Sequence, residues 1–337
     1  MEVTYVLPIR CVEHATPDPH VDLVAYLAGL AATGTEVLVV DNSDAAVFAA
    51  HATTFGGISR HLPPDVATRN GKVGNVLTGI RAAGNDRVIL ADDDVRYDVP
   101  QIEDVAGWLE GADVVVPVNV FDAWPWHARW DTARALLNRS FWFDYPGTLG
   151  VRRSTLLRTG GYDGDVLFEN LELMRTVEAA GGRVHVAPDL YVRRHPPSTR
   201  AFLGQRVRQA YDDLAQPPKL VAMLAIVPTL VWALATRRGS PVAGAVVASI
   251  AVAELGRRRS GGVDVFPWTA PLWAPLWLIE RGVCIWVAVA RRVLLGGVRY
   301  RGERLRRAAT PMHELRCRLG AQRPAVEADD ARERTAA

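Results

Sequence analysis

Residues 87–94 of the chain read Arg-Val-Ile-Leu-Ala-Asp-Asp-Asp, a short apolar run that ends in three aspartates. The β-branched run predicts a buried strand, and the aspartates predict an acidic turn at its carboxyl end. Carboxylates fixed at a strand end can hold Mg²⁺ or Mn²⁺, which then bridges phosphate oxygens. Alternate residues of a strand point in opposite directions, so Asp92 and Asp94 need a turn to share one ion. A solvated acidic turn is the alternative that the triplet alone leaves open.

Strand patterns alternate with helical patterns along the first 120 residues. The predicted strands cover residues 3–9, 36–41, 58–62, 87–91 and 113–118, and the predicted helices cover residues 21–33, 72–83 and 101–110. This alternation predicts an α/β fold with a mostly parallel, doubly wound sheet that helices cover on both faces. Ligands of such sheets bind beyond the carboxyl ends of the strands, where Asp41 and the Asp92 triplet are both expected.

The composition of the 337-residue chain, with 49% hydrophobic residues, is that of a folded protein with a sizeable core. The net charge of +2, from 39 basic and 37 acidic residues, predicts neither nucleic-acid binding nor an acidic partner. Three scattered cysteines, Cys11, Cys284 and Cys317, indicate neither a zinc site nor a disulfide framework. No signal peptide is visible at the first residues, so we expect the N-terminal domain in the cytoplasm.

Three apolar stretches follow residue 219. Residues 220–236 form an uncharged run of about 17 residues, the lower limit for crossing a bilayer core, and residues 241–255 could complete a hairpin with it. Residues 266–290 carry four tryptophans and a central Glu-Arg pair, which favours an interfacial or re-entrant segment over a spanning helix. Arginine clusters in the last third suggest a basic surface near anionic lipid, with a solvated tail as the alternative. A buried helical subdomain of a soluble protein is the alternative for all three stretches.

Residues 69–76, Arg-Asn-Gly-Lys-Val-Gly-Asn-Val, place two basic residues and small residues at a predicted junction of loop and helix. Such a junction offers backbone N–H groups and positive charge to a phosphate, and an ordinary helix start is the alternative. Asp41 opens the run Asp-Asn-Ser-Asp and could accept hydrogen bonds from a base or a ribose. A turn-forming aspartate is the plainer interpretation of Asp41.

The ordered set of motifs resembles the inverting family-two glycosyltransferases, and within them the ceramide glucosyltransferase-like membrane group. Residues 71–75 resemble a Lys-Val-x-Asn segment, residues 92–94 a D-x-D motif, and residues 147–162 an acceptor-side segment. Residues 168–173 resemble a segment with a Glu-Asp pair, and residues 205–209 resemble a Q-x-x-R-W motif. The resemblance covers about residues 1–290. It implies a glycosyltransferase-A fold, a nucleoside-diphosphate-sugar donor and a divalent metal ion, Mg²⁺ or Mn²⁺.

Two positions depart from the family pattern. Asn170 stands where the resemblance places the catalytic base, and an amide cannot accept a proton at neutral pH. Glu169 or Glu172 must then be the base, and we favour Glu169. Gln209 replaces a tryptophan that could stack on the acceptor or the sugar, which leaves the acceptor open. Arg208 could stabilise the leaving diphosphate or contact a lipid phosphate.

We therefore expect a membrane-associated inverting glycosyltransferase that moves a sugar to a hydroxyl of a lipid or a lipid-linked glycan at the cell membrane. The expected catalytic residues are Glu169, Glu172, Gln205 and Arg208. The expected donor-binding residues are Pro8, Arg10, Asp41, Asn42, Lys72, Asn75, Asp92 and Asp93. The expected metal ligands are Asp92, Asp94 and His195.

The expected domains are a catalytic domain at 1–195, an amphipathic interface segment at 196–218, membrane helices at 219–295 and a basic, partly disordered tail at 296–337. Two rival functions remain open. One is a polyprenyl-phosphate sugar synthase. The other is a non-catalytic scaffold that binds a sugar nucleotide, which the residues at 170 and 209 suggest.

Overall fold

The computed structural model describes residues 2–11 and 21–320 of the chain. The strands of its main sheet are β1 (Thr4–Ile9), β2 (Glu36–Asp41), β3 (Arg60–Leu62), β4 (Arg87–Ala91), β5 (Val95–Arg96), β6 (Val114–Phe121), β7 (Thr148–Arg152) and β8 (Val184–Arg194). They form one sheet in the order β3-β2-β1-β4-β7-β6-β8-β5. All five strands predicted from the first 120 residues are present, although the one predicted at 58–62 shortens to β3.

The sheet is mixed but mostly parallel. Strands β3, β2, β1 and β4 are parallel neighbours, and β6 is parallel to β8. Strand β7 runs antiparallel to both β4 and β6, and the short β5 runs antiparallel to β8. The predicted α/β fold is confirmed, and the parallel half places the ends of β1, β2 and β4 along one edge.

Helices cover both faces of the sheet. They are α1 (Val21–Ala32), α2 (Ala45–Phe55), α3 (Gly71–Ala82), α4 (Val99–Trp108), α5 (Trp126–Phe141), α6 (Arg153–Arg158), α7 (Glu169–Ala179) and α8 (Thr199–Tyr211), which continues into the 3₁₀ turn η1 (Asp212–Ala215). Successive residues of β1 point to opposite faces, so Tyr5 and Leu7 pack with α1 and α4, whereas Val6 packs with α3 and α7. Two apolar cores therefore hold the sheet between its helices.

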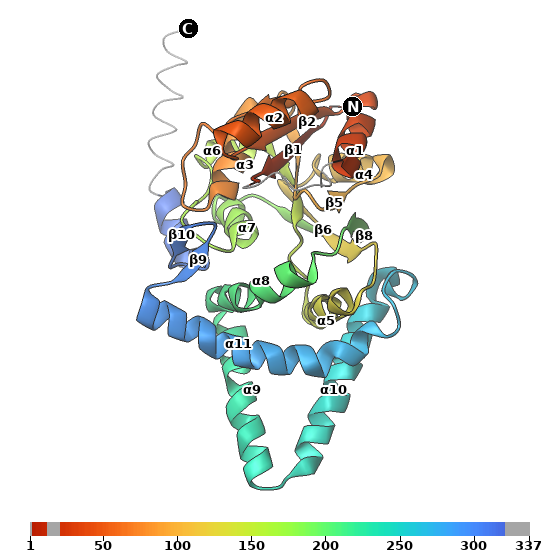
Figure 1. The fold of residues 1–337 in the computed structure, drawn as a ribbon, viewed down its shortest axis with the longest axis vertical. Helices are drawn as coiled ribbons and strands as arrows, with labels where there is room; N and C mark the ends of the chain where they lie inside the picture. Colours follow the sequence, from red (N-terminus) through yellow and green to blue (C-terminus); the bar gives the residue numbers. More distant parts are fainter. Residues whose placement is uncertain (1, 12–20, 321–337) are drawn as a thin grey trace.

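The C-terminal part begins with a helical hairpin. Helices α9 (Pro217–Ala235) and α10 (Gly239–Arg258) project away from the sheet, and α11 (Ala274–Leu295) lies across the base of this hairpin (Figure 1). The 3₁₀ turns η2 (Arg259–Asp264) and η3 (Ala270–Trp273) connect α10 to α11, and the strands β9 (Val298–Tyr300) and β10 (Glu303–Leu305) follow α11. Among the described residues, three helical segments are long and apolar enough to cross a membrane.

The charges in the middle of α11 point into the protein. Arg281 is buried and pairs with the buried Asp213 of η1 at 2.7 Å, and Glu280 accepts a hydrogen bond from Trp130 of α5 at 3.1 Å. The other face of α11 exposes apolar side chains, including Ile279. This two-sided character fits the interfacial interpretation of residues 266–290, which the sequence favoured.

Candidate active site

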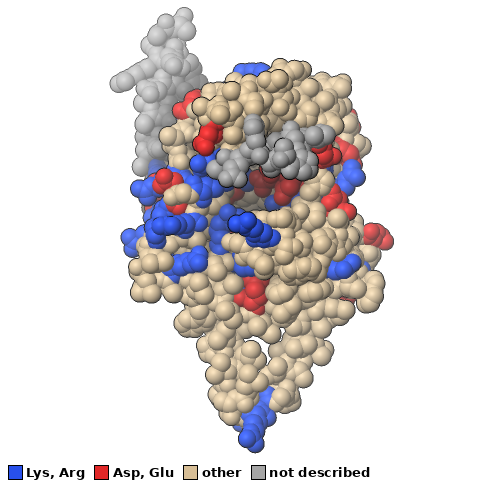
Figure 2. All heavy atoms as spheres, in the orientation of Figure 1, with Lys and Arg blue, Asp and Glu red and all other residues tan. Residues whose placement is uncertain are grey.

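A cavity of about 380 Å³ lies at the carboxyl ends of β1 and β4. Its walls come from these strand ends, from the starts of α3 and α7, from α8 with η1, and from α9, α11 and the β9–β10 hairpin. Figure 2 shows a hollow in this region with acidic side chains inside it and basic side chains below it. The cavity volume falls in the range of small-molecule sites, about 300–1,000 Å³.

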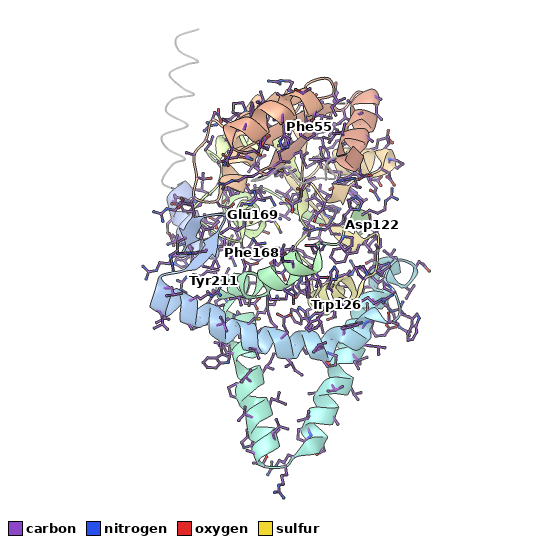
Figure 3. The ribbon with its side chains drawn as sticks, viewed as in Figure 1. Phe55, Asp122, Trp126, Phe168, Glu169 and Tyr211 are labelled. Atoms are coloured by element: carbon purple, nitrogen blue, oxygen red, sulfur yellow. The ribbon has the colours of Figure 1, made fainter. Side chains whose placement is uncertain are left out.

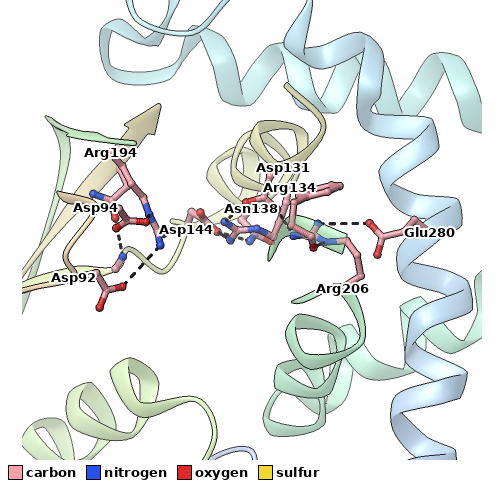
Figure 4. A network of polar contacts seen from close by, with 12 residues as sticks. Asp92, Asp94, Asp131, Arg134, Asn138, Asp144, Arg194, Arg206 and Glu280 are labelled. Carbon is pink, nitrogen blue, oxygen red and sulfur yellow. Dashed lines mark hydrogen bonds and ion pairs between the residues drawn. The ribbon is translucent and has the colours of Figure 1, made fainter. Parts of the chain in front are cut away.

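The aspartate triplet lines the cavity as a turn after β4. The backbone N–H of Val95 donates to the carbonyl of Asp92 at 3.1 Å, which closes the turn that the two outer aspartates need to face one side. Arg194, the last residue of β8, lies 2.8 Å from the Asp94 carboxylate and 3.8 Å from that of Asp92 (Figure 4). Asp92 and Asp94 therefore point to the same side of the turn.

The ionisation of the triplet follows from burial and from two cations. Burial would raise the pKa of Asp92, but Lys72 and Arg194 lower it below its ordinary value. Burial raises the pKa of Asp94, and Arg194 does not offset this effect. Burial and the charge of Asp92 also raise the pKa of Asp93. Further positive charge would thus stabilise the ionised triplet.

Asp92 and Asp94 fit a divalent cation. Carboxylate oxygens are the ligands that Mg²⁺ and Mn²⁺ prefer. Oδ1 of Asp94 is buried and has no hydrogen-bond partner in the described chain. Gly147 permits the arrangement, because a Cβ atom there would lie 2.7 Å from Oδ2 of Asp92.

Lys72 joins the triplet to α7. It is the second residue of α3, and its Nζ lies 2.6 Å from Asp92 Oδ1 and 2.8 Å from Glu169 Oε1. Burial alone would lower the pKa of Lys72, but the charges of Asp92 and Glu169 raise it above its ordinary value. Lys72 therefore carries a fixed positive charge in the cavity wall.

The two glutamates at the start of α7 have different surroundings. Glu169 lines the cavity, between the sheet and α8 (Figure 3). Glu172 is fully buried, does not line the cavity, and accepts a hydrogen bond from the N–H of Thr310 at 2.6 Å. Its position corrects the expectation that Glu172 could be the base, because an acceptor hydroxyl cannot reach it. Asn170 lines the cavity and donates to the carbonyl of Pro146 at 2.6 Å.

Three expected donor-binding residues do not line the cavity. Asn75 is buried and donates to the carbonyls of Ile9 and Val40 at 3.0 and 2.9 Å, so it ties α3 to the ends of β1 and β2. Asn42 follows β2 and its backbone N–H donates to Ile9. The Asp41 side chain is fully buried and does not face the cavity. The structure therefore places Asp41, Asn42 and Asn75 outside the lining of this cavity, in contrast to the expectation that they lie in it.

The carboxylate of Asp41 instead contacts two histidines that the sequence analysis missed. Its Oδ2 lies 2.7 Å from Nδ1 of His51 and 3.1 Å from Nε2 of His61. Burial would raise the pKa of Asp41, but hydrogen bonds from Ser43, His51 and His61 lower it below its ordinary value. One atom of each of the three side chains lies within 4.8 Å of the others, so the group could also hold a metal ion.

His195 does not join the aspartate triplet through its side chain. Its ring contacts the carboxylates of Asp22, at 3.2 Å, and Asp122, and the residue does not line the cavity. The expectation that His195 is a metal ligand beside Asp94 is therefore corrected. The neighbouring Arg194 faces the triplet instead, because alternate residues of β8 point to opposite sides.

The remaining expected residues do line the cavity. They are Pro8, Arg10, Lys72, Asp92, Asp93, Asp94, Glu169, Gln205 and Arg208. The guanidinium of Arg208 lies 4.9 Å from the centre of the Tyr300 ring, and Arg10 donates to the carbonyl of Arg301 at 3.2 Å. The segment expected as a basic tail thus contributes Tyr300 and Arg301 to the site.

Ion pairs fix α8 against its neighbours. Arg206 lies 3.0 Å from Asp131 of α5 and 3.6 Å from Glu280 of α11, and Arg134 of α5 contacts Asp144 at 2.5 Å (Figure 4). Burial would raise the pKa of Asp131, but Arg134 and Arg206 lower it to about 2. The wall that carries Arg208 is therefore held in place by charge pairs on both sides.

Comparisons with known proteins found a matching family model and solved structures that resemble this chain. The family model described as glycosyl transferase family 2 matches residues 23–167. The mannosyltransferase PcManGT from Pyrobaculum calidifontis, in complex with GDP-Man and Mn²⁺, is similar at 21% identity and a TM-score of 0.51, over 85% of this chain and 87% of that one. A glucosyl-3-phosphoglycerate synthase from Mycobacterium tuberculosis, in complex with Mn²⁺, UDP and glucosyl-3-phosphoglycerate, is similar at 18% identity and a TM-score of 0.41, over 60% and 74% of the two chains. A search of the curated proteins found no match.

Proposed function

We propose that this protein, whose residues 23–167 match the family model of glycosyl transferase family 2, transfers a sugar from a nucleoside-diphosphate sugar to a hydroxyl of a membrane lipid or a lipid-linked glycan. One observation carries the proposal. The cavity that holds the aspartate triplet is also lined by Lys219 of α9 and Arg281 of α11, which belong to the apolar helices. A donor at the triplet and an acceptor in the bilayer would meet in one cavity.

The donor diphosphate is assigned to the part of the cavity around the triplet. Asp92 and Asp94 would hold a divalent ion there, which would neutralise the diphosphate as it leaves. Lys72, Arg194 and Arg208 supply the positive charge that the protein itself offers to the phosphates. The complex of PcManGT, which contains GDP-Man and Mn²⁺, supports this assignment of donor and metal.

The reaction is proposed to invert the sugar's anomeric centre in a single displacement. The acceptor oxygen forms a bond to C1 of the sugar, the bond between C1 and the diphosphate breaks, and a carboxylate of the cavity takes the acceptor's proton. Lys72 and Arg208 stabilise the negative charge that develops on the diphosphate. Of the two glutamates expected as the base, only Glu169 lines the cavity.

The membrane assignment rests on the exposed surface of the hairpin. Helix α9 has 19 residues and α10 has 20, which correspond to about 28 and 30 Å at about 1.5 Å per residue, close to a hydrocarbon core of about 30 Å. Only 6% of the most apolar window of α9 is buried. Figure 2 shows the hairpin as an uncharged surface with basic side chains at its tip. We therefore place the hairpin in the bilayer.

The rest of the molecule is placed on one side of the bilayer. The exposed apolar face of α11, with Val283 and Trp286, would lie at the interface. The exposed arginines at 291, 292, 299 and 304 would face anionic headgroups, which attract each basic residue by about 1 kcal/mol. Basic residues mark the cytoplasmic side of membrane proteins, so we propose a cytoplasmic catalytic domain.

Release of nucleoside diphosphate tests the proposal. The full chain is incubated with GDP-mannose or UDP-glucose, with Mn²⁺ or Mg²⁺, in vesicles of membrane lipid extract. We expect metal-dependent release that Asp94→Asn reduces and that the exposed control Asp189→Asn leaves unchanged. Nucleotide binding without release from any donor would favour the non-catalytic scaffold and contradict the proposal.

A further inference from the structure

Three buried oxygens of the cavity have no hydrogen-bond partner in the described part of the chain. They are Oδ1 of Asp94, Oε1 of Gln209 and Oδ1 of Asp212. Asp94 belongs to the proposed metal site. Gln209 and Asp212 lie three residues apart where α8 continues into η1, so both can face the same region of the cavity. A ligand in that region must offer hydrogen-bond donors to these oxygens, because buried oxygens are rarely left without a partner.

Charged groups from four elements surround Asp212. They are Arg281 of α11, Glu169 of α7, Asp213 of η1 and Arg208 of α8. Arg281 donates to both carboxylate oxygens of Asp213, at 2.7 and 2.9 Å, so its charge is largely balanced there. Within residues 2–11 and 21–320, no ion pair involves Asp212. Oδ1 of this half-buried residue is thus enclosed in the cavity wall, and no cation of the described residues is bound to the carboxylate.

This environment suits proton transfer. Burial raises the pKa of Asp212 to about 7; the charges of Glu169 and Asp213 add to this effect, and those of Arg281 and Arg208 do not offset it. A general base is most effective when its pKa lies near the working pH, because it is then ionised and still binds a proton strongly. Asp212 combines this property with a position in the cavity wall.

We infer that Asp212 is the catalytic base of the transfer, an inference that rests on the proposed function. Its carboxylate takes the proton of the acceptor hydroxyl while the acceptor oxygen bonds to C1 of the sugar. The bond between C1 and the diphosphate breaks in the same step, and the diphosphate leaves with the electron pair. Gln209, on the same wall, accepts a hydrogen bond from a second hydroxyl of the acceptor.

Glu169 then has a different role. Its Oε1 lies 2.8 Å from Nζ of Lys72, so a proton placed on this carboxylate would weaken a half-buried ion pair. Glu169 therefore positions Lys72 against the donor diphosphate. Asp212 fills the role of base that Asn170 cannot fill, from a different element of the fold.

The base also selects the chemistry of the acceptor. A hydroxyl has a proton to give, whereas a lipid phosphate is ionised at neutral pH and needs no base. Asp212 has no ion-pair partner within the described residues, so its ionised carboxylate would repel a phosphate acceptor. The structure therefore favours a hydroxyl acceptor over a polyprenyl phosphate.

The test compares Asp212→Asn with Glu169→Gln and with the exposed control Asp189→Asn. Each full-length variant is assayed between pH 5 and 9 for release of nucleoside diphosphate, with vesicles of membrane lipid extract as the source of acceptor. Donor affinity is measured separately by titration of the nucleotide sugar with Mn²⁺. We expect Asp212→Asn to lose about 10²- to 10⁴-fold in kcat with donor affinity unchanged, as for loss of a general base. Glu169→Gln should weaken donor binding as well.

The pH profile separates a base from a structural residue. The kcat of the wild type should rise with pH through an apparent pKa near 7, which gives the pH profile a rising limb. Asp212→Asn should lose this rising limb. A kcat within threefold of the wild type, or an unchanged limb, would overturn the inference while leaving the proposed function intact. If Asp212→Asn does not fold, Asp212→Glu replaces it, and an unmoved limb in that variant overturns the inference. A wild type that turns over no donor contradicts the proposed function instead.

Discussion

Replacing Lys72 by methionine removes the cation between two half-buried carboxylates. The side chains of Lys72, Asp92 and Glu169 are 14%, 23% and 17% exposed, so water screens these ion pairs only weakly. Breaking a buried ion pair costs about 3–5 kcal/mol. Asp92 keeps Arg194 at 3.8 Å, so we expect the lower end, about 3 kcal/mol. For a chain of 337 residues, at about 2.1 cal/mol/K of unfolding entropy per residue, that corresponds to a fall in Tm of roughly 4 °C.

Added Mn²⁺ should reverse part of this loss. In the wild type the Lys72 ammonium already balances part of the charge of Asp92 and Glu169, so Mn²⁺ alone should raise Tm less than it does in Lys72→Met. In Lys72→Met the ion takes over that role, and at 100 times its Kd it restores about 2.7 kcal/mol. Thermal unfolding in detergent, with and without Mn²⁺, measures both effects.

Lys219→Met is the matched control for this experiment. Lys219 lines the same cavity and lies 3.3 Å from Asp213, but Asp213 keeps its shorter pair with Arg281. We expect a loss of about 1 kcal/mol and no Mn²⁺-dependent recovery. Equal Mn²⁺ shifts in Lys72→Met and the wild type, or an unchanged Tm for Lys72→Met, would refute the account of the Lys72 cluster.

Three further predictions concern other parts of the molecule. The pKa of Asp212, about 7 in the folded protein, lies above its ordinary value, so the free energy of unfolding falls as the pH rises from about 4 to 7. Asp212→Asn should therefore raise Tm at pH 8 but not at pH 4. The same Tm difference between variant and wild type at both pH values would contradict this. Gly147→Ala should push the Asp92 carboxylate aside and weaken Mn²⁺-dependent donor binding about tenfold with little change in Tm, as nucleotide titration will show. Val247→Lys, in the exposed middle of α10, should leave Tm in detergent unchanged but make the free energy of insertion into vesicles less favourable by about 2.5–3.5 kcal/mol. Full retention of the variant in the membrane fraction would argue against insertion of the hairpin.

The elements and the triplet could be predicted because their signals are local. The apolar run that ends at Ala91 has the length and composition of a strand, and the aspartates follow it directly. Lys72 was found in the same way, since a loop-to-helix junction offers positive charge to a phosphate. The order of motifs along the chain indicated the family, and the model of glycosyl transferase family 2 matches residues 23–167.

The direction of single side chains could not be predicted at the strand ends. Asp41 and Asp92 both follow apolar runs, yet only Asp92 faces the cavity, because a shift of one residue turns a side chain to the other face of a sheet. The same rule explains why Arg194, and not His195, meets the triplet. His51 lies on α2 and His61 on β3, and only the packing of these elements beside β2 brings the two rings to Asp41. No local pattern in the sequence predicts this contact.

Asp212 was missed for a different reason. It belongs to no motif, and its properties come from burial between α8, α7 and α11, segments far apart in the sequence. The same is true of Tyr300 and Arg301, which reach the cavity through the β9–β10 hairpin. Residues whose roles depend on such long-range packing leave no local pattern to detect.

Transfer of a labelled sugar into lipid tests the central claim most directly. The full chain is reconstituted in vesicles of membrane lipid extract with Mn²⁺ and with GDP-mannose or UDP-glucose that carries a radiolabel in the sugar. We predict that label enters the organic-solvent extract, that its linkage resists the mild acid that cleaves sugar phosphates, and that Lys72→Met abolishes its transfer. Label that stays in the water phase with both donors, although nucleotide binds, would contradict the account.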